Sequence, residues 1–555
     1  MSCIKGDKSA NVGLLMEASW EVCNKIGGIY TVLSTKSRVL KEKYGDKLVF
    51  IGPDFNAASY KSPYFEESPV FKNFIKSKEL PFNIKVRSGR WKIPGSPQVI
   101  LVDFEGVFPE LDSIFGEMWE LFKVDSMHEY GDYREGCAFA VASAIVMEEL
   151  RKYLGVDSQA TICHFNEWTT AMGLLYIRKI NPEIATVFTT HATSIGRSIC
   201  GNGKPLYDYF DGYHGDQMAR ELNMEAKHSL EKQAAHYADC FTTVSDVTAR
   251  ECKQLLDIEP QVVTPNGFEP DFIPDDKKYA KLRKEGRKKL SDILARLTGK
   301  GFSDSALLVA TSGRNEFRNK GIDIFLDSLK ELHSLAPYKE VVGLILVPGW
   351  VKEPAPEFLN DAFEGESEKG RFMTHTINNP HYDAITLKVM DMKSRGLFSG
   401  NIKLLFIPCY LDGNDGVVNI SYYDILPAID LTVFASYYEP WGYTPLESIA
   451  FGIPTITTDK SGFGKWVLSN FINSFQSCGV RVIGRNDSNY SDVAREIALQ
   501  INDFSHEPLS ARQQISKAAV ATSEQADWKC FFEKYEDAFV VAETRRNERI
   551  KELTQ

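Results

Sequence analysis

The sequence has few features of a zinc-binding, disulfide-bonded or membrane protein. Its 10 cysteines are scattered singly, without a CxxC pair or another metal-ligand spacing, so neither structural zinc nor a disulfide framework is expected. No apolar run is long enough to span a membrane. The opening segment MSCIKGDKSANVGLL lacks the basic region and apolar stretch of a signal peptide. We therefore expect a cytoplasmic protein with reduced thiols and no membrane partner.

Basic charge and the common cofactor motifs are also scarce. The formal net charge of −11 at pH 7 argues against nucleic acid as the main partner. The chain has no Walker A sequence, no GxGxxG and no DxD. This disfavours a P-loop ATPase and a nicotinamide enzyme, and it gives no hint of a carboxylate-bound metal. We predict no metal and no cofactor, while a small basic pocket for an anion is still compatible with the net charge.

The chain does have length and a repeating pattern of strands and helices. Its 555 residues are too many for one core, so two or more domains are expected. Buried-strand patterns alternate with amphipathic helices, which predicts parallel βαβ units. The predicted strands are 12–19, 47–51, 99–102, 161–165, 185–190, 240–244, 261–264, 306–311, 341–347, 403–407, 431–435, 454–458 and 480–483. A charge-rich stretch at 268–301, interpreted as a solvated helical connection, divides this pattern into two halves.

The predicted fold is α/β, with two doubly wound Rossmann-like domains and a ligand-binding interdomain cleft at the carboxyl ends of the strands. We place an N-terminal domain at 1–267 and a second domain at 268–522. A final helical segment at 523–555 is expected to return to the first domain. One long helix is predicted at 214–238, and the segment 350–399 is longer than a simple connection.

One stretch predicts a strand, a turn, a helix and a strand in succession: LTVFASYYEPWGYTPLESIAFGIPTITT. Thr444 stands in the N-cap position before a proline, and Glu447 three residues later would complete a capping box. Gly442 allows close approach of the backbone, and a helix N-terminus at this point is suited to binding phosphate. Glu439 and Glu447 flank this site, although a turn carboxylate and a capping carboxylate would explain either residue taken alone.

Further candidate ligand-binding residues follow other predicted strands, on the side where an open α/β sheet binds its ligand. They are Lys25, Gly27, Gly28, His191, Arg197, Arg314 and Lys320. Two of these cations share the loop SGRNEFRNKG, and together with a helix N-terminus they could hold a diphosphate. For a lone surface cation a solvated role is the ordinary alternative. For a lone histidine, a hydrogen-bonded place in the core is equally compatible.

Several segments together resemble the glycogen synthases of the animal and fungal type. They are EASWEVCNKIGGIYTVL, TVFTTHATSIGR, AAHYADCFTTVSDVTARE, VVTPNG, GRNEFRNKG, SYYEPWGYTPLES and TTDKSGFG. The resemblance extends from about residue 12 to residue 535, and the short N-terminus and missing regulatory parts suggest a bacterial homologue. It implies a retaining glycosyltransferase with the two-domain GT-B fold. Such an enzyme moves glucose from a nucleoside diphosphate glucose to the non-reducing 4-OH of an α-1,4-glucan such as glycogen.

The resemblance also implies roles for the candidate residues. Arg314 and Lys320 would bind the donor diphosphate and offset the charge of the leaving group. Glu439 and His191 would lie beside the transferred glucose. The residues that would bind or close over the donor nucleotide are Lys25, Gly27, Gly28, Arg197, Gly442, Tyr443, Thr444, Glu447 and, stacked on the base, Tyr422 or its neighbour Tyr423. No general base is evident, so we expect a front-face displacement in which the leaving phosphate takes the proton of the acceptor.

The chain departs from the family in its regulatory parts. Eukaryotic members carry an arginine-dense helix for glucose 6-phosphate before an Asp-Trp pair, whereas only Arg512 and Lys517 are basic before Asp527-Trp528 here. We therefore expect no strong activation by a sugar phosphate. UDP-glucose is the favoured donor and ADP-glucose the alternative. Another retaining transferase making a small glucoside such as sucrose, and an inactive glucan-binding scaffold, are the alternative functions. Because 350–399 differs from the family's oligomer-contact region, the sequence leaves open whether the protein is a homo-oligomer.

Overall fold

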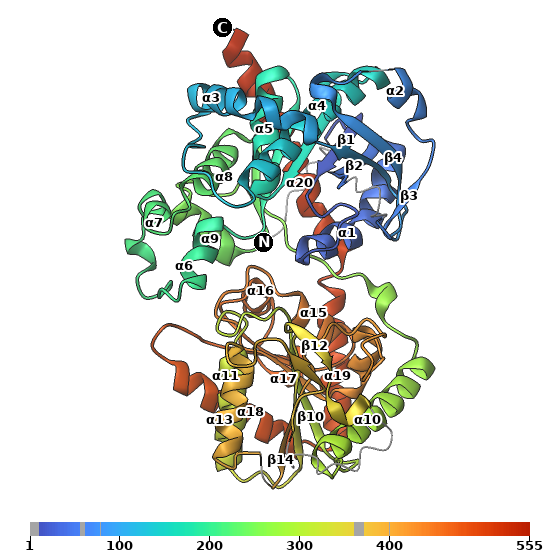
Figure 1. Ribbon diagram of the computed structural model, residues 1–555, viewed down its shortest axis with the longest axis vertical. Coiled ribbons are helices and arrows are strands. Elements are labelled where there is room, and N and C mark those ends of the chain that lie inside the picture. Colours follow the sequence, from blue (N-terminus) through green and yellow to red (C-terminus); the bar gives the residue numbers. More distant parts are fainter. Residues whose placement is uncertain (1–9, 56–61, 78, 360–370, 399, 555) are drawn as a thin grey trace. The chain divides into compact units, whose positions relative to one another are not determined.

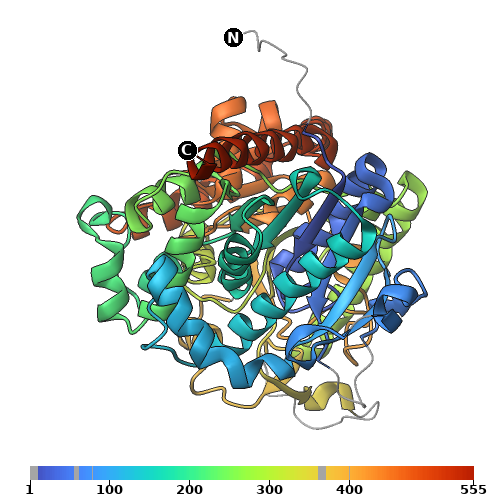
Figure 2. The ribbon, with the colours of Figure 1, turned by 90° about the horizontal axis from the view of Figure 1, so that it is seen from above.

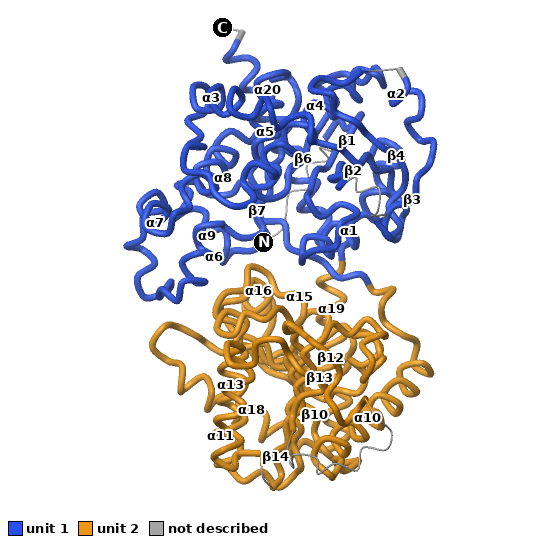
Figure 3. The backbone as a smooth tube through the Cα atoms, in the orientation of Figure 1, with its two compact units in different colours: residues 1–269, 528–555 blue, residues 270–527 orange. Residues whose placement is uncertain are grey.

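The computed structural model describes residues 10–55, 62–77, 79–359, 371–398 and 400–554. The chain forms two compact units (Figures 1 and 3): unit 1 is Met1–Glu269 with Trp528–Gln555, and unit 2 is Pro270–Asp527. The boundary predicted at 522 would cut helix α19 (Leu509–Glu524). This helix packs on α15 (Tyr443–Ala450) and α17 (Phe475–Cys478) of unit 2, so unit 2 extends beyond it.

Unit 1 is built on a sheet with the strand order β3-β4-β5-β2-β1-β6-β7-β8-β9. The strands are β1 (Leu14–Ala18), β2 (Leu48–Pro53), β3 (Phe65–Glu67), β4 (Lys85–Trp91), β5 (Gln98–Asp103), β6 (Thr161–Asn166), β7 (Ala185–Thr190), β8 (Cys240–Thr243) and β9 (Val262–Val263). Neighbouring strands are parallel except at one edge, where β4 runs antiparallel to β3 and β5. The sequence pattern did not predict this edge. The central strands β1, β2, β6 and β7 are buried along their whole length, as their apolar sequences predict.

The sheet of unit 1 is covered by helices. They are α1 (Gly28–Tyr44), α2 (Lys72–Ser77), α3 (Leu111–Phe122), α4 (Tyr133–Leu154), α5 (Trp168–Ile180), α6 (Ser194–Gly201), α7 (Gly215–Glu221), α8 (Glu225–Tyr237), α9 (Asp246–Leu255) and α20 (Trp528–Thr554). The prediction of one long helix at 214–238 is wrong, because the chain breaks between α7 and α8. Asn223 has a φ of 53° there, a left-handed conformation that a continuous helix cannot contain.

Helix α20, the long dark red helix of Figure 2, comes from the end of the chain. It packs in unit 1, beside α1, β7 and β8. The indole N–H of Trp528 donates to the hydroxyl of Thr35 at 2.8 Å. Tyr535 covers the ammonium of Lys36 with its ring, 4.3 Å from the centroid. Arg549 pairs with the buried Asp239 at 2.9 Å. These buried polar contacts hold the last helix in unit 1.

Unit 2 has a fully parallel sheet with the strand order β14-β11-β10-β15-β16-β17 and a separate hairpin, β12-β13. The strands are β10 (Leu307–Ser312), β11 (Val341–Leu346), β12 (Val351–Pro354), β13 (His375–Ile377), β14 (Ile402–Phe406), β15 (Leu431–Phe434), β16 (Thr455–Thr458) and β17 (Val480–Ile483). The helices are α10 (Asp276–Thr298), α11 (Ile322–Ser334), α12 (Pro356–Leu359), α13 (Ala384–Ser394), α14 (Tyr422–Ile425), α15 (Tyr443–Ala450), α16 (Gly462–Asn470), α17 (Phe475–Cys478), α18 (Tyr490–His506) and α19.

The charged stretch before unit 2's first strand is the helix α10. The prediction that it is simply solvated is wrong for one face, which buries Leu290 and Leu294. Arg287 of the same helix pairs with Asp430 at 2.9 Å. The predicted long connection at 350–399 contains the β12-β13 hairpin and α13, while its residues 360–370 and 399 lie outside the described residues. Within the described chain, every helix is too short or too polar to cross a lipid bilayer.

Candidate functional site

In unit 2, the basic loop and the turn before α15 follow two neighbouring strands. Loop 313–321 follows β10, turn 435–442 follows β15, and these strands lie side by side in the sheet. The two segments are joined through their backbones, because the carbonyl of Asn319 accepts from the amides of Tyr437 at 2.9 Å and Tyr438 at 3.1 Å. The sheet order and this junction bring the two predicted segments together.

This junction places Lys320 against Glu439. Their side chains form an ion pair and are 15% and 13% exposed. Arg314, on the same loop, is 53% exposed and pairs with Glu316 at 3.0 Å. The structure therefore brings together the predicted lysine and glutamate, and it holds a second cation on the same loop, accessible to a ligand.

The helix α15 begins two residues earlier than predicted, and the predicted capping box is wrong. Gly442 is the N-cap residue, with a φ of 115° that favours glycine, and no side chain caps the helix. Thr444 therefore lies inside the first turn. Glu447 accepts instead from the hydroxyl of Tyr423 at 2.8 Å.

The neighbouring tyrosines of α14 have different surroundings. The ring of Tyr423 lies between those of Phe272 and Phe451, stacked at centroid distances of 5.0 and 5.8 Å. The hydroxyl of Tyr422 lies 2.9 Å from that of Ser312, at the end of β10. Tyr423 is thus stacked on two protein rings, whereas the ring of Tyr422 meets that of Tyr423 at a tilt of 57°.

In unit 1, the loop before α1 is organised by a carboxylate that sequence reasoning missed. Glu21 accepts hydrogen bonds from the amides of Gly27 and Tyr30, both at 2.8 Å. Gly27 is the N-cap residue of α1, and Gly28 and Lys25 are exposed beside it. Glu21 thus satisfies the helix N-terminus, where the sequence indicated only two glycines.

The segment 190–194, which carries His191, is held by three glutamates from other elements. Glu167, directly after β6, accepts from the amide of His191 at 2.8 Å. Glu231 of α8 accepts from the amide of Ser194 at 2.8 Å and from the hydroxyl of Thr190. The segment is therefore fixed through its backbone.

The third of these carboxylates belongs to Glu251 of α9. It accepts from the hydroxyl of Thr193 and from its amide, the latter at 3.2 Å. Thr193 in turn caps α6, where its hydroxyl accepts from the amide of Gly196 at 3.0 Å. A side chain at Gly196 would overlap with the carboxyl group of Glu251, which explains the glycine. Arg197 is exposed one residue further along α6.

Close packing of these carboxyl groups changes their acidity. Burial and the neighbouring charge of Glu231 raise the pKa of Glu167 to about 7. Burial raises the pKa of Glu231 to about 7 as well, and the charge of Glu251 adds to this effect. Glu167 and Glu231 are therefore partly protonated near neutral pH.

The ring of His191 is neutral at physiological pH. Burial, followed by the positive charge of Lys36, lowers its pKa to about 3. Its Nε2 lies 3.1 Å from Oδ1 of Asn166. His191 can therefore act as a hydrogen-bond partner for a ligand, but not as a cationic acid.

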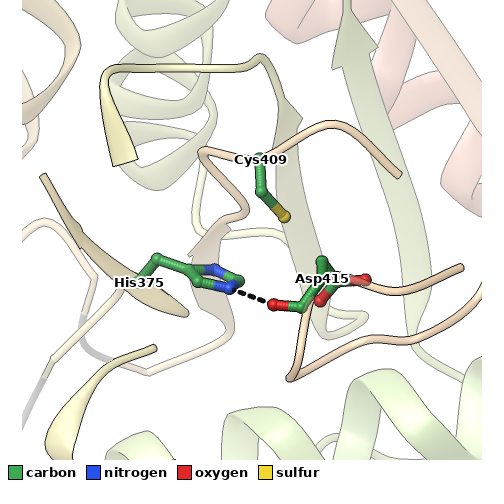
Figure 4. A group of neighbouring side chains, drawn as sticks. All are labelled: His375, Cys409 and Asp415. Atoms are coloured by element: carbon green, nitrogen blue, oxygen red, sulfur yellow. Dashed lines mark hydrogen bonds between the residues drawn. The ribbon is translucent and has the colours of Figure 1, made fainter. Parts of the chain in front are cut away.

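A further group of metal-type ligands lies in unit 2 (Figure 4). Side-chain atoms of His375, Cys409 and Asp415 lie within 4.8 Å of one another. However, both ring nitrogens of His375 are hydrogen-bonded at 2.9 Å, Nε2 to the Asp415 carbonyl and Nδ1 to the hydroxyl of Thr374. The Asp415 carboxylate accepts from the amides of residues 417–419. Burial raises the pKa of the Cys409 thiol to about 12. Hydrogen bonding accounts for this group, and we assign no metal to it.

Two Rossmann-like units, with the predicted ligand residues at the carboxyl ends of their strands, are the architecture of the GT-B glycosyltransferases. Solved structures share this fold. The catalytic domain of starch synthase IV from Arabidopsis thaliana, bound to ADP and acarbose, has a TM-score of 0.57 at 15% identity, covering 97% of this chain and 100% of that chain. The α,α-trehalose 6-phosphate synthase from Burkholderia multivorans has a TM-score of 0.53 at 11% identity, covering 98% and 99%.

The chain belongs to the glycogen synthase family, whose model matches residues 17–361 and 364–551. The glycogen [starch] synthase of Neurospora crassa is 28% identical over 93% of this chain and 81% of its own length. The human liver protein of the same name is 28% identical, covering 95% and 82%. Isoform 1 from Saccharomyces cerevisiae is 27% identical, covering 93% and 84%. The resemblance found in the sequence motifs is thus confirmed for the family and the fold.

Proposed function

We propose that this protein transfers glucose from a nucleoside diphosphate glucose to the non-reducing end of an α-1,4-glucan such as glycogen, with retention of configuration. UDP-glucose is the favoured donor, and ADP-glucose is the alternative. The observation that carries the proposal is the pairing of Lys320 with Glu439 at the carboxyl ends of β10 and β15. An open α/β sheet binds its ligand at this edge.

In unit 2, the two cations of the basic loop act on the donor diphosphate. Arg314 and Lys320 bind its oxygens and stabilise the negative charge that develops as the diphosphate leaves. Glu439 lies beside the transferred glucose and holds the ammonium of Lys320 in place. Backbone amides at the start of α15, from Gly442 to Thr444, are suited to the distal phosphate. Tyr422 stacks on the base and Glu447 binds the ribose.

In unit 1, His191 contacts the transferred sugar. Arg197, Lys25, Gly27 and Gly28 complete the donor contacts. The bond between the anomeric carbon and the diphosphate oxygen breaks, and a new bond forms on the same face with the 4-OH oxygen of the acceptor. The proton of that hydroxyl passes to an oxygen of the leaving diphosphate. This route needs no protein base, which agrees with the low pKa of His191, whose buried ring binds a proton only weakly.

The test is transfer of radiolabelled glucose from UDP-glucose and from ADP-glucose to a glycogen primer. We expect Glu439→Ala to abolish transfer while the thermal unfolding temperature stays close to that of the wild type. Glu496→Ala is the matched control, because it removes a carboxylate that pairs with Arg481 at 3.4 Å elsewhere in unit 2. Substantial transfer by Glu439→Ala would overturn the assignment.

Product analysis separates the alternative functions. Label in a small glucoside such as sucrose would indicate a different acceptor, and binding without turnover would indicate a glucan-binding scaffold.

The described cysteines are free thiols, which supports a cytoplasmic location. Light scattering of the purified protein measures whether copies associate.

A further inference from the structure

One buried amide determines how the ring of His191 can hydrogen-bond. Asn166, the last residue of β6, is 1% exposed. Its Nδ2 lies 3.0 Å from Oε1 of Glu17 and 3.3 Å from the carbonyl oxygen of Ala18. An ionised carboxylate and a carbonyl can only accept hydrogen bonds. The NH2 end of the amide must therefore face them, and its Oδ1 must face His191.

Glu17 is ionised because it forms a buried ion pair. Nζ of Lys36 lies 2.8 Å from Oε1 of Glu17, and both side chains are 1% exposed. Burial acts to raise the pKa of Glu17, but the charges of Lys36 and His164 and the hydrogen bonds from Lys36 and Asn166 together outweigh it, so the net pKa is lowered. Nδ1 of His164 also lies close to this carboxylate, 3.3 Å from Oε1 of Glu17. Oε1 of Glu17 is thus a permanent acceptor for the amide of Asn166.

The orientation of this amide selects one tautomer of His191. Oδ1 of Asn166 can only accept, so Nε2 of His191, 3.1 Å away, carries the ring proton. A neutral imidazole has a single N–H group, which leaves Nδ1 as an acceptor. Among the residues that the structure describes, Nδ1 of His191 has no hydrogen-bond partner. The opposite tautomer would set the lone pair of Nε2 against that of Oδ1 inside the core, at the cost of a lost buried hydrogen bond.

We propose that Asn166 and Glu17 are positioning residues that fix the tautomer of His191, so that its Nδ1 accepts a hydrogen bond from a hydroxyl of the transferred sugar. This rests on the proposed function, in which His191 contacts that sugar. The contacted position must then carry a donor group. A carboxylate, an ether or a fluorine at that position offers only lone pairs and is rejected. The donors selected are nucleotide sugars with a free hydroxyl there, and hexuronic acids oxidised at that position are excluded.

The tautomer is measured directly on the full chain, without any donor. The protein is labelled with ¹⁵N-histidine, and the His191 resonances are identified by their absence in His191→Ala. We expect a protonated Nε2 and an unprotonated Nδ1 in the wild type, and a mixture of both tautomers in Asn166→Ala. Protonated Nδ1 in the wild type would overturn the proposal. This measurement on the unmodified protein remains decisive even where Asn166→Ala does not fold.

The matched control is Asn181→Ala. Asn181 also donates its amide to a buried glutamate of unit 1, Glu148, at 3.2 Å, but it has no contact with His191. We expect the His191 resonances and the transfer rate to be unchanged in this variant. A change as large as that in Asn166→Ala would show that loss of any such amide disturbs the ring, and would refute the specific role of Asn166.

Donor analogues test the consequence for specificity. Each hydroxyl of the glucose in UDP-glucose is replaced in turn by fluorine and by an amine. We expect fluorine at one position to lower kcat/KM about tenfold in the wild type, the amine there to restore it, and the discrimination to vanish in His191→Ala. In Asn166→Ala, kcat/KM for UDP-glucose should fall about tenfold while binding of UDP alone is unchanged. Equal tolerance of fluorine at every position would overturn the inference. No transfer from any nucleotide glucose would instead refute the proposed function, and the resonances would still report the tautomer.

Discussion

Replacement of Glu231 by glutamine should make the protein more stable at alkaline pH. The carboxylate of Glu231 is fully buried and accepts from the amide of Ser194 and the hydroxyl of Thr190. The oxygen of a glutamine can accept from Ser194, and its NH2 group can donate to Thr190. The hydroxyl of Thr190 can then donate to the carbonyl of Ala192, 3.2 Å away. Glu231→Gln therefore imitates the protonated acid with every group satisfied.

The magnitude follows from the shifted acidity of Glu231. Its pKa rises from 4.5 to about 7 through burial, which corresponds to about 3 kcal/mol of unfolding free energy. The folded protein holds this proton more tightly than the unfolded chain. The contribution to stability is therefore fully present below pH 4.5 and is lost as the pH rises through about 7. A glutamine has no proton to lose, so the variant keeps the stability that the wild type loses.

Urea denaturation at pH 5 and at pH 8 measures this effect. We expect wild type and Glu231→Gln to agree within about 1 kcal/mol at pH 5, and the variant to be more stable by up to about 3 kcal/mol at pH 8. Glu148→Gln is the control, because Glu148 is a buried carboxylate of the same unit that binds Arg151 at 2.8 Å. This control should lose stability at both pH values. An identical pH dependence in wild type and Glu231→Gln would refute the reasoning.

Three further substitutions test the site and its support. Arg314→Ala should lower kcat about 10²–10³-fold by removing charge stabilisation of the leaving group, and unchanged turnover in the transfer assay would contradict this role. Lys36→Met leaves Glu17 buried without its counter-ion and should lower the unfolding free energy by about 3–5 kcal/mol; urea denaturation with a loss below about 1 kcal/mol would argue against the ion pair. Gly196→Ala sets a methyl group against Glu251 and should cost about 1–3 kcal/mol in the same measurement, together with slower transfer. A Gly196→Ala variant as stable and active as the wild type would show that the segment around Gly196 adapts to the added methyl group.

Much of the fold could be predicted from the sequence, because strand and helix patterns are local. The strands at 185–190 and 480–483 have the predicted bounds. The basic loop and the turn before α15 could be placed at strand ends by the same patterns. Local patterns were less reliable at helix ends, because the backbone conformation determines which residue begins or ends a helix. Gly442 takes the N-cap position from Thr444, and Asn223 interrupts the predicted helix, because each adopts a left-handed conformation that the surrounding chain stabilises.

The sequence by itself determined the family, the class of fold and the residue types available for a diphosphate and a sugar. Only the tertiary structure decided which of those residues meet. Three glutamates that hold the segment 190–194 come from separate parts of the sequence: Glu167, Glu231 and Glu251. The local sequence around each of them does not show which groups its carboxylate binds. They converge on the segment 190–194 because the order of β6, β7 and β8 places those elements around it. In the same way, Asn166 acts on His191 because β1, β6 and β7 are neighbours in the sheet, a pairing set by long-range packing and not by any local spacing.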